Sequence, residues 1–258
     1  MTAAPDGGRS RWRAAVEALT GPYTVGPFTL VLMAALASLG LLYIFIAELV
    51  QERTLHAPEL AFDRAVPLQP AWALVYGTLY LFLILLPLFV VRQEALIRRT
   101  LLAYLTVWSV AYAFFLLYPT VAPRPEAVTG EGFGVWGLKL LYSADPPYNC
   151  FPSLHVAHSF VSALACYRVH RRTGIAAALG ASLVGVSTLY TKQHYVADVI
   201  AGIALAGVAS AVFLRRPPRE AIPERDRRLA PVLALGLIGM LGLVVAGCWV
   251  AYRLMGKA

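Results

Sequence analysis

Long apolar runs, each with at most one charged residue, alternate with polar segments along the whole chain. The runs cover residues 27–50, 71–91, 100–118, 153–167, 174–190, 195–214 and 229–252. A helix of about 20 residues crosses a bilayer, and most of the runs approach that length. Because an open strand would leave its backbone groups without partners in lipid, each run is expected to be a helix. The pattern predicts an all-α, polytopic membrane bundle of six core transmembrane helices with a seventh at the C-terminus.

Composition narrows the class of protein further. Hydrophobic residues make up 59% of the chain and charged residues 14%, whereas a soluble domain carries about 25% charged residues. The excess of apolar residues requires lipid around much of the surface. The N-terminal segment contains three arginines, but no small-residue cleavage site follows the first apolar run. Residues 27–50 are therefore expected to stay in place as a span rather than to be removed as a signal peptide.

The distribution of basic residues predicts the orientation. With the N-terminus in the cytoplasm, 15 of the 22 Lys and Arg lie on the cytoplasmic side. The formal charge of +8 is thus interpreted as an orientation signal beside anionic lipid, and no nucleic-acid partner is expected. We expect an integral protein of a bacterial inner membrane, and its oligomeric state stays open. Its predicted parts are a cytoplasmic segment 1–26, a six-helix core 27–214, a basic cytoplasmic loop 215–228 and a further helix 229–258.

Three polar clusters lie at span ends, and this topology places all of them on the extracytoplasmic side. They follow the third span at 118–125, open the fourth at 149–158 and join the fifth and sixth at 187–198. The long loop 119–152 is rich in Pro and Gly, and its residues 135–142 form an amphipathic stretch suited to the membrane interface. Histidines with unrelated structural roles would have no reason to share one face, so their convergence indicates a site.

His194 and Asp198 are four residues apart, so on a helix they lie on the same face. A carboxylate there accepts a hydrogen bond from one imidazole nitrogen, which fixes the tautomer and leaves the other nitrogen as a nucleophile or base. An ionised Asp inside a span is costly without such a partner. The alternative is a purely structural pair.

His155 falls in the first turn of the fourth span, just after Ser153. Free backbone N–H groups and the positive end of a helix bind anions, so Ser153 and this turn are candidate phosphate contacts. A histidine here could donate a proton to a departing alkoxide, or it could be an ordinary interfacial polar residue. His158 is expected to pack one turn further in. The spacing of the two histidines lacks the Glu of a zinc-protease helix.

Two basic residues of these clusters are candidate phosphate ligands. Arg124 lies between Pro123 and Pro125, which restrict its backbone, and a guanidinium matches the geometry of phosphate. Lys192 stands two residues before His194. Arg124 could instead be an ordinary interfacial cation, and Lys192 is left open. The three cysteines have no metal-ligand spacing, so neither a metal nor another cofactor is expected.

The clusters resemble the motifs of the type 2 phosphatidic acid phosphatase superfamily, which are Lys-x6-Arg-Pro, Pro-Ser-Gly-His and Ser-Arg-x5-His-x3-Asp. The matching positions are Arg124 and Pro125 in the first motif, Pro152, Ser153 and His155 in the second, and Ser187, His194 and Asp198 in the third. The resemblance covers residues 118–202 and the order of the spans around them. It implies a mechanism without metal in which His194 attacks phosphorus, Asp198 orients His194, and His155 protonates the leaving group.

Three positions depart from the family motifs. Leu117, Leu154 and Thr188 stand where the family has Lys, Gly and Arg, so two phosphate-binding cations are missing. The Pro-Ser-Leu-His and His-Tyr-x2-Asp patterns are more similar to the branch that contains fungal inositol phosphorylceramide synthase and, more distantly, sphingomyelin synthase. That resemblance implies transfer of a phospho-headgroup from a lipid phosphoester to a lipid hydroxyl, with Arg124 and Lys192 holding the phosphate.

Three functions stay open at this point. The leading expectation is an enzyme that acts on a lipid phosphoester at the outer leaflet through a phosphohistidine. Such an enzyme would either transfer the group to a lipid hydroxyl or release it to water. The third function is a lipid-phosphate transporter or binding protein. The missing cations favour it, but an oriented His–Asp pair disfavours it, because binding needs no such pair.

Overall fold

The computed structural model describes residues 25–215 and 222–255, and their regular secondary structure is helical, with two isolated bridges in the loops. The predicted N-terminal segment 1–26 lies almost wholly outside the described residues, as does the centre of the predicted basic loop 215–228. In chain order the helices are α2 (Pro27–Val50), α3 (Ala61–Ala65), α4 (Trp72–Val90), α5 (Glu94–Leu117), α6 (Phe133–Ala144), α7 (Leu154–Val169), α8 (Arg171–Tyr190), α9 (Val196–Phe213) and α10 (Glu224–Met255).

Six of these helices, α2, α4, α5, α8, α9 and α10, are long and apolar enough to cross a membrane. Their outward faces carry large apolar side chains, and Leu41 and Leu243 are 81% and 76% exposed. In water such a surface would be unfavourable, whereas lipid solvates it and the helices satisfy their own backbone groups. The prediction of an all-α integral membrane protein is therefore confirmed.

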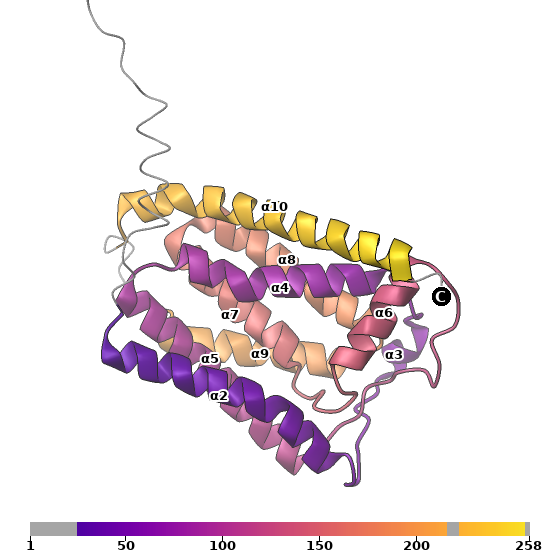
Figure 1. Ribbon diagram of the computed structural model, residues 1–258. Coiled ribbons are helices and arrows are strands. Elements are labelled where there is room, and N and C mark those ends of the chain that lie inside the picture. The colour runs from indigo at the N-terminus through magenta and orange to yellow at the C-terminus, as the bar shows by residue number, and fades with distance from the viewer. Residues whose placement is uncertain (1–24, 216–221, 256–258) are drawn as a thin grey trace, which may run out of the picture.

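The fourth predicted span is α7, which lies at the centre of the bundle. It has 16 residues and a length of about 24 Å at 1.5 Å per residue, less than the hydrocarbon core of a typical bilayer. Eleven of its residues are buried, whereas only five of the 24 in α2 are. α7 packs against α4, α5, α8 and α9, while α2 lies outside α5 and α10 lies outside α4 and α8 (Figure 1).

Three helices begin earlier than their predicted spans, among them α8, which begins at Arg171 rather than at residue 174. α5 begins at Glu94 rather than at residue 100, and α10 begins at Glu224, inside the predicted basic loop 215–228. Acidic residues in the first turn stabilise a helix by interacting with its positive N-terminal end. In α10, Arg228 also pairs with Glu224 at 2.9 Å. Hydropathy marks only where a helix becomes apolar, so it misses these charged first turns.

The long helices alternate in direction, so the junctions α2–α4, α5–α7 and α8–α9 gather at one end of the bundle, here called the site end (Figure 1). The short helices α3 and α6 also lie there. α6 contains the predicted amphipathic stretch 135–142 and packs against α4 and α10. The three polar clusters therefore share one end, as expected. The side of the membrane that this end faces stays a prediction.

Candidate active site

Hydrogen bonds join two loops at the site end, and both loops carry side chains of the site. Thr120, just after α5, accepts a hydrogen bond through Oγ1 from the N–H of Cys150 at 3.0 Å. Val121 and Tyr148 form an antiparallel bridge next to it. These bonds satisfy backbone groups in an irregular segment that has no helix to do so. As a result, the loop that carries Arg124 lies against the loop that enters α7.

Ser153 is the N-cap residue of α7. Its Oγ accepts a hydrogen bond from the N–H of Val156 at 3.4 Å, and its own N–H donates to the carbonyl oxygen of Asp198 at 3.0 Å. The side chain is fully buried. Ser153 thus starts the helix and ties it to α9, which is a structural role. Its contact with phosphate stays a prediction.

His194 is presented by the short loop between α8 and α9. The carbonyl oxygen of Thr188 accepts hydrogen bonds from the N–H groups of Gln193 and His194, at 2.9 and 3.3 Å, which turns the chain after α8. His194 Nδ1 lies 3.2 Å from Asp198 Oδ2, which also accepts from the N–H of Tyr195 at 2.9 Å. The predicted pair is formed, although His194 precedes the helix instead of lying on it. With Nδ1 engaged, Nε2 is the nitrogen left for chemistry.

The second histidine meets this free nitrogen. His155 Nδ1 lies 3.3 Å from His194 Nε2, and the two side chains come from different elements, α7 and the α8–α9 loop. The rings of Tyr76 and Tyr80 in α4 flank His155 with centroid distances of 5.3 and 4.7 Å. Because α4 packs on α7, these rings restrict the orientation of the imidazole. The structure therefore brings together the histidines that the motifs predicted.

Asp145, which follows α6, belongs to the same cluster and was missed by the sequence patterns. Its Oδ2 lies 3.9 Å from His155 Nε2 and 4.0 Å from Arg124 Nη2. The hydroxyl of Tyr43 donates to Oδ1 at 3.0 Å, and Gln193 Nε2 donates to Oδ2 at 3.3 Å. The one signal in the sequence is an acidic residue three positions after the amphipathic stretch and directly before a Pro-Pro pair. That signal does not indicate where the side chain points.

Arg124 lies beside Asp145 in the same cluster. Its Nη2 donates to the carbonyl oxygen of Asp145 at 2.8 Å and to the side-chain oxygen of Gln193, and its guanidinium lies 4.4 Å from the centre of the Tyr142 ring. The side chain is 11% exposed, and Nε is buried without a hydrogen-bond partner among the described residues. A buried donor without an acceptor is costly, so an acceptor at Nε would be favourable.

The other basic candidate, Lys192, and the two positions where the family has a cation, Leu117 and Thr188, lie outside the histidine pair. Lys192 Nζ donates to the carbonyl oxygen of Asp63 in α3 at 3.3 Å, so this ammonium is engaged outside the cluster. Leu117 is 83% exposed at the end of α5. Thr188 is fully buried, and its hydroxyl donates to a main-chain carbonyl of α8. Neither position supplies a cation, and Arg124 is the basic side chain that the structure brings to the two histidines.

His158 lies in the core of the bundle and is engaged there. Trp108 Nε1 donates to His158 Nδ1 at 3.2 Å, and the ring of Tyr104 stacks on the imidazole with a centroid distance of 4.1 Å. The side chain is buried. These contacts agree with the packing role expected from the sequence.

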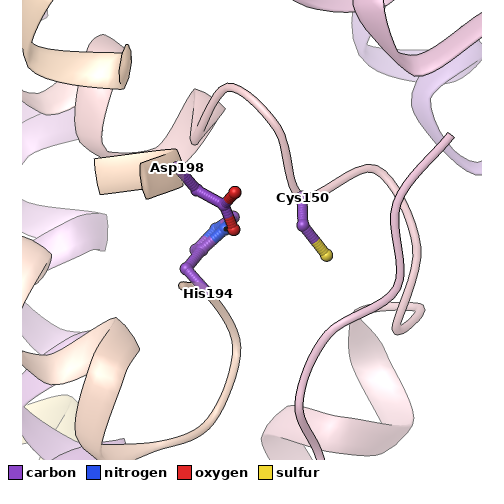
Figure 2. Close-up of side chains that lie close together, drawn as sticks. All are labelled: Cys150, His194 and Asp198. Atoms are coloured by element: carbon purple, nitrogen blue, oxygen red, sulfur yellow. Dashed lines mark hydrogen bonds and ion pairs between the residues drawn. The ribbon is translucent and has the colours of Figure 1, made fainter. Parts of the chain in front are cut away.

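Cys150 lies beside the His194–Asp198 pair, and the three residues could each offer one ligand atom to a metal (Figure 2). The candidate atoms lie within 4.8 Å of one another, and Asp198 Oδ1 is buried without a hydrogen-bond partner among the described residues. Burial, reinforced by the charges of Asp198 and Asp145, raises the pKa of the Cys150 thiol well above its usual value. A protonated thiol is a poor ligand, so the set fits a metal poorly. That the site works without metal stays a prediction.

Comparison with known proteins agrees with the resemblance of the motifs. A family model described as the PAP2 superfamily matches residues 41–212, which is more than half of the chain. The chain belongs to the PAP2 superfamily. A PA-phosphatase related-family protein of Dictyostelium discoideum is 25% identical over 118 residues, which cover 42% of this chain and 21% of that protein. No solved structure matches the chain. The PAP2 match includes every residue described above around the two histidines, from Tyr43 to Asp198.

Proposed function

We propose that this PAP2 protein transfers a phosphorus-containing group from a lipid phosphoester through a covalent phosphohistidine on His194. The observation that carries the proposal is the pairing of the two histidines. His194 Nε2 lies 3.3 Å from His155 Nδ1, while His194 Nδ1 is bonded to Asp198. This is the arrangement of an oriented nucleophile beside a proton donor. A protein that only binds lipid phosphate needs cations, but it does not need a nucleophile oriented beside a proton donor.

The proposed reaction has two steps that share one set of side chains. In the first, His194 Nε2 attacks phosphorus, the P–O bond to the leaving alcohol breaks, and His155 gives its proton to the departing oxygen. Asp198 holds the Nδ1 proton and stabilises the charge that develops on the ring. In the second step, an acceptor hydroxyl attacks the same phosphorus, the N–P bond breaks, and His155 takes the acceptor's proton. Arg124 holds the non-bridging oxygens, with Nε as the unpaired donor.

The charge of the cluster favours transfer of a phospho-headgroup, the reaction of the inositolphosphotransferase branch. A phosphate monoester brings two negative charges, and its reaction depends on cations that stabilise the transition state. A diester brings one. The structure brings Arg124 to the histidines, while Leu117 is exposed and Lys192 is bonded to α3. A diester lipid as donor and a lipid hydroxyl as acceptor suit these contacts better than a monoester and water.

Hydrolysis of a lipid phosphate is the second candidate function. It needs the same phosphohistidine, with water in place of the acceptor hydroxyl in the second step. The Dictyostelium relative is named as a PA-phosphatase related protein, which favours this reading. The two candidates differ only in what reaches the phosphorus in the second step.

A panel of substrates tests the proposal on the purified protein in lipid nanodiscs. Diester phospholipids and phosphatidic acid are offered with and without diacylglycerol or ceramide as acceptor. We expect headgroup transfer that depends on the acceptor and that is abolished in His194→Ala and His155→Ala. His56→Ala is the matched control, because His56 is an exposed histidine at the same end of the bundle.

The outcomes separate the three functions. Residual transfer by His194→Ala above about a tenth of wild type would remove His194 from the covalent role. Faster release of inorganic phosphate from phosphatidic acid than any transfer would make hydrolysis the function. Specific binding without turnover would make the chain a binding protein.

A further inference from the structure

Asp145 lies between the two groups that the proposed function assigns to the substrate phosphate. Its Oδ2 is 4.0 Å from Arg124 Nη2 and 3.9 Å from His155 Nε2. A phosphate that contacts the guanidinium and the imidazole must therefore approach this carboxylate within a few ångströms. The family motifs do not include this position, although its carboxylate lies beside the guanidinium of Arg124.

Hydrogen bonds from two other elements hold this carboxylate in place. Tyr43 in α2 donates to Oδ1 at 3.0 Å, and Gln193 in the α8–α9 loop donates to Oδ2 at 3.3 Å. The side chain is 15% exposed. Because Gln193 directly precedes His194, the carboxylate is also fixed relative to the nucleophile. The carboxylate of Asp145 is thus held in the cluster by hydrogen bonds and does not extend into solvent.

The charges of the cluster leave little room for a second negative charge on the ligand. The positive charge of Arg124 lies beside Asp145, and the second carboxylate, Asp198, is bonded to His194. Between an effective dielectric constant of about 20 and the value of water, about 80, two unit charges roughly 5 Å apart change an equilibrium constant by between a few hundredfold and about fourfold. Water at the edge of the site weakens this effect without changing its sign. A dianion experiences the repulsion twice as strongly as a monoanion.

We infer that Asp145 is a specificity-determining residue that selects monoanionic phosphodiesters over dianionic phosphomonoesters. The inference deepens the proposed function, and its consequence for catalysis rests on it. Removing the charge should improve the binding of monoesters much more than that of diesters. Substitution of a residue that only supports the fold would change the dissociation constants of both ligands by the same factor.

The test compares two soluble probes that differ in charge at phosphorus. Phenyl phosphate is a dianion at pH 8, and methyl phenyl phosphate is a diester with one charge. Dissociation constants are measured by ligand-dependent thermal stabilisation of the purified full chain and of Asp145→Asn. In the variant we expect about tenfold tighter binding of phenyl phosphate and a change of less than about threefold for the diester. Glu126→Gln removes the same charge from an exposed position in the α5–α6 loop and should leave the ratio unchanged.

Several results would overturn the inference. They are an equal change for both probes, no change for phenyl phosphate, or no binding of either probe to wild type and variant. Asp145→Ser, which also removes the charge, carries the same expectation where the Asn variant does not fold. Because binding is measured without turnover, the two proposals fail separately. An inactive protein with the expected change in the ratio would refute only the phosphotransfer, whereas an active protein with an unchanged ratio would refute only the role of Asp145.

Discussion

The close approach of α9 to the start of α7 predicts the effect of a single methyl group at Gly202. A Cβ built at Gly202 would lie 2.6 Å from the carbonyl oxygen of Ser153 and 3.3 Å from Val156 Cβ. A comfortable contact needs about 3.5 Å, so Gly202→Ala requires the two helices to separate by roughly 0.9 Å at this point. The obstructing atom belongs to the main chain and cannot rotate away. We expect a loss of about 1–3 kcal/mol in the free energy of unfolding, as for other overpacked cores.

The same separation should reduce activity more than stability suggests. The start of α7 carries His155, and the N–H of Ser153 donates to the carbonyl oxygen of Asp198 at 3.0 Å. The contact at Gly202 therefore lies between the helix that carries His155 and the helix that carries Asp198. A displacement of about 1 Å in reacting groups costs up to roughly a hundredfold in rate. We therefore expect kcat/KM to fall by about tenfold to a hundredfold. The rate and the free energy of unfolding are both measured on the variant in detergent.

Gly207→Ala is the matched control on the same helix. A Cβ there meets no atom within 4 Å, so the substitution should leave activity unchanged and should stabilise the helix by up to about 1 kcal/mol. If Gly202→Ala were as stable and as active as Gly207→Ala, the packing of α9 on α7 would not be what positions the histidines.

Three further predictions test the charge, the chemistry and the orientation of the site. Arg124→Lys should lower kcat/KM by about tenfold or more at unchanged stability, because an ammonium cannot replace a planar fork; full activity would contradict the phosphate-binding role. Chelators should leave the initial rate unchanged, and Cys150→Ser should stay active, whereas loss of activity in both experiments would indicate a metal. In a variant without native cysteines, an impermeant thiol reagent should label Thr129→Cys but not Glu224→Cys in intact cells, and the reverse pattern would place the site end in the cytoplasm.

The sequence predicted the membrane fold well because the free energy of crossing lipid depends on runs of apolar residues. The helix that this criterion describes least well is α7, which has 16 residues and lies inside the bundle. It was predicted as the apolar run 153–167, although that run is shorter than a full span. The charged first turns of α5 and α10 were missed, since a helix can extend beyond lipid into charged residues, where hydropathy no longer marks it.

The site was predictable where the chain itself sets the geometry. The pairing of His194 with Asp198 follows from local spacing, and the alternation of the helices places His155 at the same end. Asp145 was missed because its contacts come from α2, α7 and the α8–α9 loop, and no local pattern encodes them. Lys192 shows the converse. It is two residues from the nucleophile, but its ammonium is bonded to α3, because closeness in sequence does not set the direction of a side chain.

Direct detection of a phosphohistidine tests the central claim. Wild-type protein is mixed with a lipid phosphoester that carries the label in the transferred group, in the absence of acceptor, and is quenched in base. The proposal predicts a label that is stable to base and labile to acid, bound to the peptide that contains His194, and released when a lipid hydroxyl is added before the quench. A turning-over enzyme that shows no such label, or that carries it on His155 instead, would contradict the assignment of His194 as the nucleophile.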